Sequence, residues 1–262
     1  MIIEMEEGKK KIIYLFNEKV KNKVIDISGY NKKHCGKEGY WLEKQFGIQS
    51  NRKNEPDIYG YEMKKGSTKI TFGDFQATEY LFSKKKQILL ERNQFSNLDI
   101  SRNKFIEYFG EPNEKKNNRY SWSGKCFPIL NKWNDCGQKI IIDENDNILI
   151  LYSYDNDKRT RKLLFPDFLK NKELIIAIWL SDNLRKKINN KFNKTGFFIC
   201  KKNKEFFYSI CFGNPFDFNF FIKSFQEKKI FIDSGMYVGN NRPYSQFRAS
   251  SNFWNNLIIE EY

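Results

Sequence analysis

Three ionisable side chains lie within a stretch of eight residues: Asp57, Glu62 and Lys64. If the last part of this stretch is a strand, Glu62 and Lys64 point to the same face, because neighbouring residues alternate across a sheet. Pro56 stiffens the approach to Asp57, and Gly60 lets the backbone bend before the strand. The spacing therefore predicts two carboxylates that converge on a divalent cation, with an ammonium group beside them.

This set of residues fits the hydrolysis of a phosphodiester bond. Asp57 and Glu62 offer the oxygen ligands that Mg²⁺ prefers, and Lys64 can orient or deprotonate the attacking water and neutralise the phosphate. Glu43, a further carboxylate upstream, can ligate a second metal ion or position a water molecule. The solvated edge of a strand stays open as the alternative, because 30% of the chain is charged.

Size and charge indicate a folded protein with a polyanionic partner. The chain has 262 residues, of which 40% are hydrophobic and 17% aromatic, enough for a sizeable core. Its 46 Lys and Arg against 32 Asp and Glu give a formal net charge of +14. Such a balance favours nucleic acid above all, or an anionic membrane surface. A general compositional bias toward lysine and asparagine is the alternative.

Other features narrow the compartment and the chemistry. The sequence has neither an apolar run long enough to span a membrane nor a signal peptide, so we expect a cytoplasmic protein without membrane contact. An odd number of cysteines without a CxxC pair predicts reduced thiols: Cys35, Cys126, Cys136, Cys200 and Cys211. The single histidine, His34, argues against zinc fingers, paired-histidine centres and Ser-His-Asp hydrolases.

Periodicity and turn residues predict an α/β (α+β) protein. Helices are predicted at 4–25, 39–46, 101–109 and 216–225. Strands are predicted at 61–64, 69–75, 139–143, 148–154, 174–180, 196–200, 206–212 and 229–233. Residues 111–138 and those after 234 are predicted to be loops and a short tail. We expect a catalytic lobe over 1–135 and a DNA-recognition lobe, rich in hairpins, over 136–262.

Glycines and carboxylates near the N-terminus stand at fixed spacings, namely Gly36-x-x-Gly39-x-x-Leu42-Glu43, Gly47-Ile48-x-x-Asn51 and Pro56-Asp57-x-x-Gly60-x-Glu62-x-Lys64. This series resembles the MvaI/BcnI family of type II restriction endonucleases, which are related to the nicking enzyme MutH within the PD-(D/E)xK nucleases. The similarity resumes after 216, through Gly235-Met236-Tyr237 and Gln246-Phe247-Arg248. Residues 80–195 do not align with the family.

The resemblance implies a mixed sheet flanked by helices, with a second lobe for recognition. It implies that Asp57 and Glu62 are metal ligands, that Lys64 is the catalytic lysine, and that Glu43 is an additional acidic catalytic residue and ligand. The implied activity is Mg²⁺-dependent cleavage of double-stranded DNA at a short, GC-containing site, with Mn²⁺ as a substitute.

The C-terminal part is where the resemblance places base recognition. Arg248, which follows an aromatic residue, is a candidate for a bidentate contact with a guanine edge. Arg242, Tyr244 and Gln246 lie in a polar segment that can enter a groove or form an ordinary surface loop. Asp233 can accept a hydrogen bond from a cytosine amino group or cap a turn.

Several partners and alternatives follow. Besides duplex DNA, we expect a cognate DNA methyltransferase in the same system, not as a physical partner; monomer and dimer both stay open. His34 either contacts DNA or is a solvated loop residue. The rival functions are a MutH-like nicking enzyme of DNA repair, a sequence-specific DNA-binding module without activity and, less favoured, an RNA nuclease.

Overall fold

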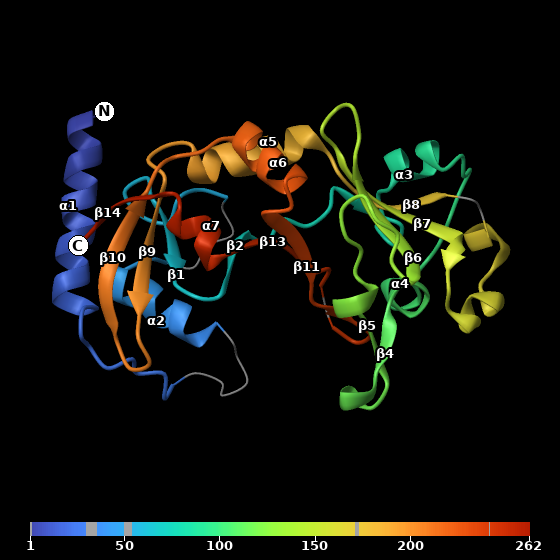
Figure 1. Cartoon of the computed structure of the whole chain (residues 1–262), viewed down its shortest axis with the longest axis horizontal. Coiled ribbons are helices and arrows are strands. Elements are labelled where there is room, and N and C mark those ends of the chain that lie inside the picture. The colour runs from blue at the N-terminus through green and yellow to red at the C-terminus, as the bar shows by residue number, and fades with distance from the viewer. Residues whose placement is uncertain (1, 30–35, 50–53, 171–172, 241) are drawn as a thin grey trace. The chain divides into compact units, whose positions relative to one another are not determined.

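The computed structural model describes residues 2–29, 36–49, 54–170, 173–240 and 242–262 (Figure 1). The chain forms two compact units, and each of them is discontinuous in sequence. The first comprises Met1–Ile70, Arg185–Phe221 and Ala249–Tyr262; the second comprises Thr71–Leu184 and Ile222–Arg248. The boundary expected between residues 135 and 136 falls inside the second unit, because the strand Glu79–Tyr80 before it pairs with the strand Leu174–Trp179 after it.

A mixed four-stranded sheet organises the first unit. Its strands follow the order β1 (Glu62–Lys65), β9 (Phe197–Lys202), β10 (Phe207–Gly213) and β14 (Ile258–Glu261). β1 pairs with β9 in parallel, and the other pairs are antiparallel. The hairpin of β9 and β10 was predicted from the sequence, whereas the parallel pairing joins segments that are far apart in it.

Helices cover both faces of this sheet. α1 (Ile2–Lys19) and α2 (Lys37–Phe46) bury their apolar side chains with Tyr61, Met63 and Phe198 in one core. On the opposite face, aromatic residues pack together from α5 (Ser181–Phe192), from β9 and from α7 (Ser251–Asn255). The mixed sheet flanked by helices that the sequence predicted is confirmed.

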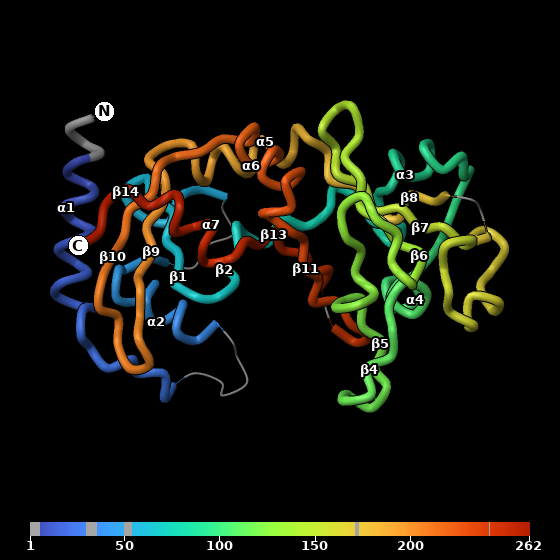
Figure 2. Tube along the Cα trace, in the orientation of Figure 1, coloured from blue at the N-terminus to red at the C-terminus, as the bar shows by residue number. Residues whose placement is uncertain are grey.

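The two ends of the described chain meet in the first unit. Figure 2 shows the N-terminal helix in blue beside the C-terminal strand in red, and Lys9 forms an ion pair of 2.6 Å with Glu260. The short tail predicted from the sequence is therefore an edge strand, because β14 pairs with β10 in the antiparallel direction.

The second unit contains three small sheets. One is antiparallel in the order β3 (Glu79–Tyr80), β8 (Leu174–Trp179), β7 (Ile148–Asp157), β6 (Cys136–Ile142). Another is β12 (Met236–Tyr237), β5 (Arg119–Trp122), β4 (Glu111–Asn113). The third, most of whose residues belong to this unit, is β11 (Ile230–Ser234), β13 (Ser245–Ser250), β2 (Lys69–Gly73).

Short helices complete this unit. They are α3 (Gln87–Arg92), α4 (Arg102–Phe109) and α6 (Phe218–Gln226), which begins in the first unit, with 3₁₀ turns at Glu114–Lys116, Gly124–Cys126, Thr160–Leu164 and Asp167–Lys170. The core is aromatic, with fully buried Trp122, Trp179 and Tyr152.

Two regions expected to be loops contain strands. Residues 111–138 hold β4, β5 and the start of β6, and the segment after 234 holds β12, β13, α7 and β14. Most of these strands are short, between two and six residues, so that no local apolar pattern marks them. In the described ranges no helix has both the length and the apolar character needed to cross a membrane.

The N-cap of α4 gives a stability test. Ser101 Oγ accepts a hydrogen bond of 3.2 Å from the Lys104 backbone N–H, which would otherwise lack a partner in the first helical turn. Ser101→Ala should lower the free energy of unfolding by about 0.5–2 kcal/mol, measured by urea denaturation. Ser101→Asp, which keeps a capping oxygen, should stay close to the unsubstituted protein; equal losses in both variants would contradict the capping role.

Candidate active site

A tight turn connects the two carboxylates of the sequence motif. Asp57 Oδ2 accepts a hydrogen bond of 2.9 Å from the Met63 backbone N–H, across a turn in which Ile58 bridges to Tyr61. Gly60 in this turn has φ +83°, a conformation that glycine adopts without strain. The turn thereby fixes Asp57 beside the start of β1.

The alternation of β1 directs its charged residues to one face. Met63 packs into the apolar core, and Glu62 and Lys64 flank it with only 2% and 6% of their surfaces exposed. Lys64 Nζ donates a hydrogen bond of 2.8 Å to Glu62 Oε1 and lies 5.3 Å from the centre of the Phe192 ring. The two residues are therefore a buried, paired set rather than a solvated strand edge.

A second lysine, which sequence reasoning missed, meets the same carboxylate. Lys191 Nζ lies 3.0 Å from Glu62 Oε1, the oxygen that also accepts from Lys64. Lys191 is in the last turn of α5, inside the region that did not align with the family. No local pattern around it marks a function; only the parallel pairing of β1 with β9, which follows α5, brings it to the site.

The third acidic candidate lies on α2. Glu43 is half-buried, and its pKa is raised by burial and then by the charge of Glu62, while Lys191 and Lys64 act in the opposite direction. Two ion pairs hold this helix to the sheet, since Glu38 binds Lys65 at 2.8 Å and Lys202 at 2.7 Å. The structure thus places Glu43 close enough to Glu62, Lys64 and Lys191 for their charges to shift its pKa.

Asp57, like Glu43, resists ionisation in the folded protein. Burial and the neighbouring Glu62 raise the pKa of Asp57 to about 6, although Lys64, Lys191 and the hydrogen bond from Met63 oppose the shift. Burial also lowers the pKa of Lys64, against the attraction of Glu62. Mutual repulsion of buried carboxylates is the electrostatic condition under which a cation binds well.

These residues fit a divalent cation. Glu62 Oε2 is buried and accepts no hydrogen bond from the described part of the chain, so one oxygen of the central carboxylate keeps its lone pairs for a ligand. Asp57, Glu62 and Glu43 offer oxygen donors only, the kind that Mg²⁺ and Mn²⁺ bind. Metal ligation by these three carboxylates remains a prediction.

The predicted DNA-reading residues lie together in the second unit. Arg248 on β13 donates two hydrogen bonds, of 3.0 and 2.7 Å, to Gln246 Oε1, and its Nε lies 3.4 Å from Asp233 Oδ2 on the neighbouring β11. Arg242 stacks on Tyr244, with 5.4 Å between guanidinium and ring centre. Their grouping agrees with a common role, which itself stays a prediction.

An acidic neighbour of this group was missed. Arg242 Nη1 lies 3.5 Å from Asp74 Oδ2, and Arg242 is 66% exposed. Asp74 follows β2, so that sequence alone gives no reason to connect it with a residue so far along the chain. The remaining candidate, His34, lies outside the described residues.

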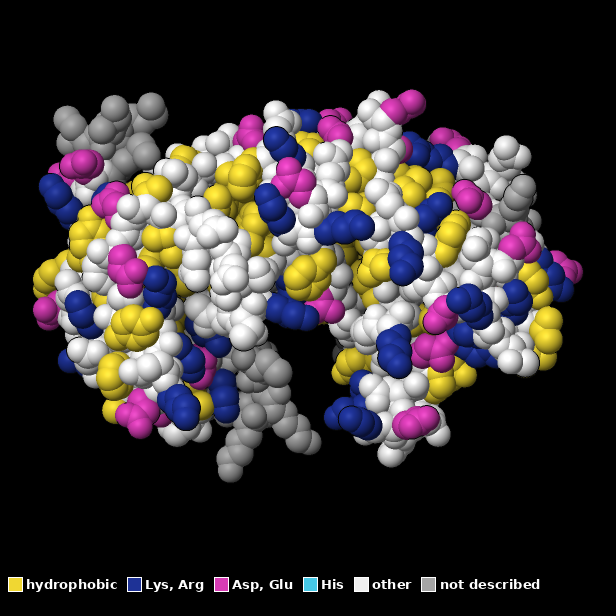
Figure 3. Space-filling view, viewed as in Figure 1, with side chains coloured by type: hydrophobic (Ala, Val, Ile, Leu, Met, Phe, Trp, Pro, Cys, Tyr) yellow, Lys and Arg dark blue, Asp and Glu magenta, His cyan; other side chains and the backbone are white. Residues whose placement is uncertain are grey.

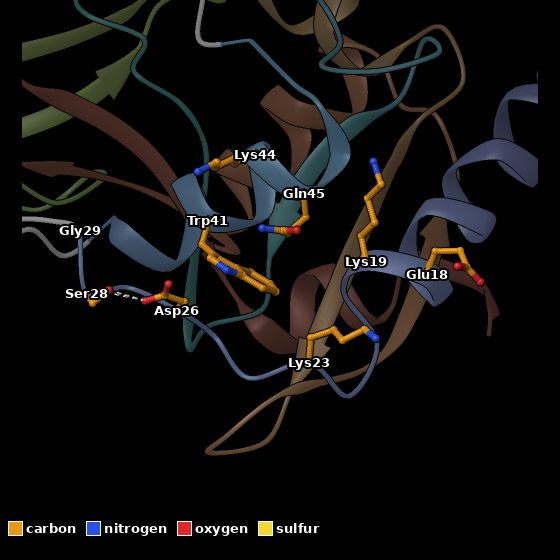
Figure 4. A pocket seen from close by; sticks show the side chains of 9 residues that line it. All are labelled: Glu18, Lys19, Lys23, Asp26, Ser28, Gly29, Trp41, Lys44 and Gln45. Carbon is orange, nitrogen blue, oxygen red and sulfur yellow. Dashed lines mark hydrogen bonds between the residues drawn. The ribbon is translucent and has the colours of Figure 1, made fainter.

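A surface pocket of about 700 Å³ lies elsewhere in the first unit (Figure 4). Its basic residues are Lys19, Lys23 and Lys44, and Trp41 of α2 forms part of the wall. Figure 4 also shows Asp26 hydrogen-bonded to Ser28 at its rim. The residues of the catalytic motif do not line this pocket, and its charges are mixed.

One further group of metal-type side chains occurs in the described residues, formed by Glu111, Cys126 and Cys136. The Arg159 guanidinium occupies it, 3.3 Å from Glu111 and 3.8 Å from Cys126 Sγ. Cys126 Sγ donates to the Phe109 carbonyl oxygen at 2.8 Å, and burial raises its pKa far above the usual range. The group is a satisfied hydrogen-bond network, and its thiols are free, as the sequence predicted.

Three comparisons relate this chain to known proteins. The family model of the LlaMI restriction endonuclease matches residues 20–262. The type II restriction enzyme ScrFI of Lactococcus lactis subsp. cremoris is 40% identical over 270 residues, covering 98% of this chain and 99% of the relative. The structure of restriction endonuclease MvaI with its cognate DNA substrate covers 98% of this chain and 97% of that chain, with a TM-score of 0.59 and 13% identity. That last match shows a shared fold.

The raised pKa of Asp57 predicts that the stability of the fold depends on pH. Its pKa rises from 3.8 to about 6 on folding, so the folded protein loses stability as pH increases through this window and keeps the full penalty above it. Asp57→Asn should therefore raise the free energy of unfolding at pH 7.5, without metal, by on the order of 1–3 kcal/mol. The gain should shrink as pH falls from about 6 to 4.5, because the folded Asp57 becomes protonated and the penalty for its charge is lost.

Urea denaturation between pH 4.5 and 8 measures this effect. Asp155→Asn, which neutralises an exposed aspartate, is the matched control and should change stability little at any pH. A destabilised Asp57→Asn protein at pH 7.5 would contradict the electrostatic account.

Proposed function

Because the chain belongs to the LlaMI restriction endonuclease family, a family of type II enzymes, we propose that it hydrolyses one phosphodiester bond in each strand of duplex DNA at a short specific site. The observation that carries the proposal is the buried Glu62, which shares one oxygen with two lysines and leaves the other oxygen without a partner. An acidic and basic set of this kind suits a negatively charged substrate and a cation together.

Asp57, Glu62 and Glu43 would hold the cation, which we propose to be Mg²⁺, with Mn²⁺ as a substitute. When bound there, the cation supplies positive charge that stabilises the pentavalent phosphorus and eases deprotonation of the attacking water. Lys64 orients that water, because its ammonium is fixed by Glu62 and by the Phe192 ring. Its lowered pKa also suits a residue that exchanges protons with water.

The products follow from the direction of attack. Water oxygen forms a bond to phosphorus while the bond to the 3′ oxygen breaks. One water proton passes to solvent, and the leaving 3′ oxygen takes up a proton from solvent. The ends are then a 5′-phosphate and a 3′-hydroxyl.

Base recognition belongs, in this proposal, to the second unit. Arg248 is held by Gln246 and Asp233, so its guanidinium is oriented before DNA binds, and a guanine edge is the natural bidentate acceptor. A GC-containing site follows from this assignment.

The first unit, which carries the motif, would be the catalytic lobe. On the face drawn in Figure 3, Lys and Arg side chains are spread among acidic ones, and the net charge of +14 favours phosphate contacts.

We also propose a cytoplasmic location and a cognate methyltransferase that protects the host sites. The paired set of Asp57, Glu62 and Lys64 disfavours a binding module that has lost its chemistry. A nicking enzyme remains the rival, and the first experiment separates the two.

The central test removes the shared carboxylate. Glu62→Ala should lower cleavage of a sequenced plasmid in Mg²⁺ by more than about 1,000-fold, because the cation loses a ligand and Lys64 loses its partner. Specific DNA binding, measured by gel shift in Ca²⁺, should be retained. Glu205→Ala, which removes an exposed carboxylate on a hairpin turn, is the matched control.

Discrete double-strand fragments from the unsubstituted protein alone would support a restriction enzyme, and run-off sequencing of the ends would give site and stagger. Nicked circles as the final product would favour the nicking enzyme. Full cleavage by Glu62→Ala, or cleavage unaffected by EDTA, would end the proposal.

A second test addresses recognition. Arg248→Ala should lower kcat/KM at the specific site by about 5- to 150-fold, since one bidentate base contact contributes about 1–3 kcal/mol of discrimination. Binding to non-specific DNA should change much less. Lys229→Ala removes an exposed cation of the same unit and serves as the control. Unchanged site preference in Arg248→Ala would assign base reading to other residues.

A further inference from the structure

Two ammonium groups share a single carboxylate oxygen at the heart of the first unit. Lys64 Nζ and Lys191 Nζ lie 2.8 and 3.0 Å from Glu62 Oε1, while Glu62 Oε2 has no partner in the described chain. The motif that carries the proposed function accounts for Lys64 only. Lys191 comes from a different element and has no assigned role.

The side chains of the two lysines differ in how far they can move. The Lys64 side chain is 7% exposed and is confined under the Phe192 ring. The Lys191 side chain is 17% exposed and extends from the last turn of α5, so it can change direction without disturbing β1. Lysine, with its flexible stem, suits a group that moves between two acceptors.

The helix that carries Lys191 is itself fixed against the active-site loop. Ile188 and Phe192 are fully buried, and Asn54 Nδ2 donates a hydrogen bond of 2.8 Å to the Lys187 carbonyl oxygen. Asn54 precedes Asp57 by three positions. The backbone of Lys191 is therefore fixed relative to the carboxylates, whereas its side chain can reorient.

Charge balance indicates what Lys191 does. Without a cation, Asp57, Glu62 and Glu43 repel one another, and Lys191 reduces that repulsion for both Asp57 and Glu43. Three carboxylates, two ammonium groups, one divalent cation and one phosphate group together carry no net charge. If Lys191 were absent, that assembly would keep one excess negative charge in a buried site, which opposes the further negative charge of the transition state.

We propose that Lys191 is a second active-site lysine, which neutralises Glu62 in the metal-free protein, releases it to the cation, and then binds a non-bridging oxygen of the scissile phosphate. This inference rests on the proposed nuclease function. Lys191 then competes with the metal ion for Glu62 before DNA binds and promotes cleavage after DNA has bound.

The two roles predict opposite changes in one variant, namely tighter metal binding and slower cleavage. Lys191→Gln should bind Mn²⁺ at least about threefold more tightly in the DNA-free protein, measured by isothermal titration calorimetry, because the competing cation is gone. The same variant should cleave at least about tenfold more slowly in a single turnover at saturating Mg²⁺, because the phosphate loses a charged partner. A purely structural residue would weaken both.

Matched variants complete the design. Lys194→Gln removes an exposed lysine three residues away and should leave Mn²⁺ binding and cleavage unchanged. Lys191→Arg, which keeps the charge, should keep near-normal Mn²⁺ affinity and cleave faster than Lys191→Gln. Thermal melting of each variant checks that the fold is retained.

Equal Mn²⁺ binding by Lys191→Gln and the unsubstituted protein would overturn the proposal, as would cleavage rates within twofold of each other. Parallel loss of both would also overturn it and leave Lys191 a structural residue. The nuclease function is judged separately: if the unsubstituted protein cuts and Glu62→Ala does not, that function stands whatever Lys191→Gln does.

Discussion

The burial of ionised carboxylates is the constraint on which the first unit depends. Glu62 is only 2% exposed, and a charge so placed is tolerated when it is paired with opposite charge. The protein supplies two ammonium groups for one oxygen and leaves the other oxygen open. A site arranged in this way is incomplete by itself. Its remaining repulsion is seen in the raised pKa of Asp57 and Glu43, and the cation that we propose would relieve it.

The architecture around the site follows from the need to hold these charges in place. β1 is a short strand at the edge of its sheet, and its alternation separates Met63 in the core from Glu62 and Lys64. The parallel partner β9 follows α5, and the crossover delivers Lys191 to the same face. α2, clamped to β1 and β9 through Glu38, brings the third carboxylate. β1 therefore contributes two charged groups to the site, and α5 and α2 contribute one each.

This arrangement explains which parts could be predicted from the sequence. Asp57, Glu62 and Lys64 are local, so spacing and strand alternation were sufficient to group them. Lys191 and Asp74 reach their sites through pairing of distant strands, and neither has a neighbouring pattern that marks it. The same reason accounts for the missed strand β12, whose partner β5 is more than 100 residues earlier in the chain. The division into discontinuous units could not follow from composition, because no linker separates them.

The two groups of functional candidates obey different physical rules. At the motif, three carboxylates face two lysines, and burial raises the free energy of the ionised carboxylates. The folded protein thereby gives up some stability to keep a site that suits a cation. Around Arg248, each guanidinium has a carboxylate or amide partner, so the reading group is oriented yet already satisfied. If Arg248 reads a base, as we propose, DNA must replace Gln246 and Asp233 as its acceptors. Only a base edge with two well-placed acceptors does so without loss, and a mismatched edge leaves the arginine with its own protein partners. Selectivity at that position then arises from competition within the chain as much as from attraction to DNA.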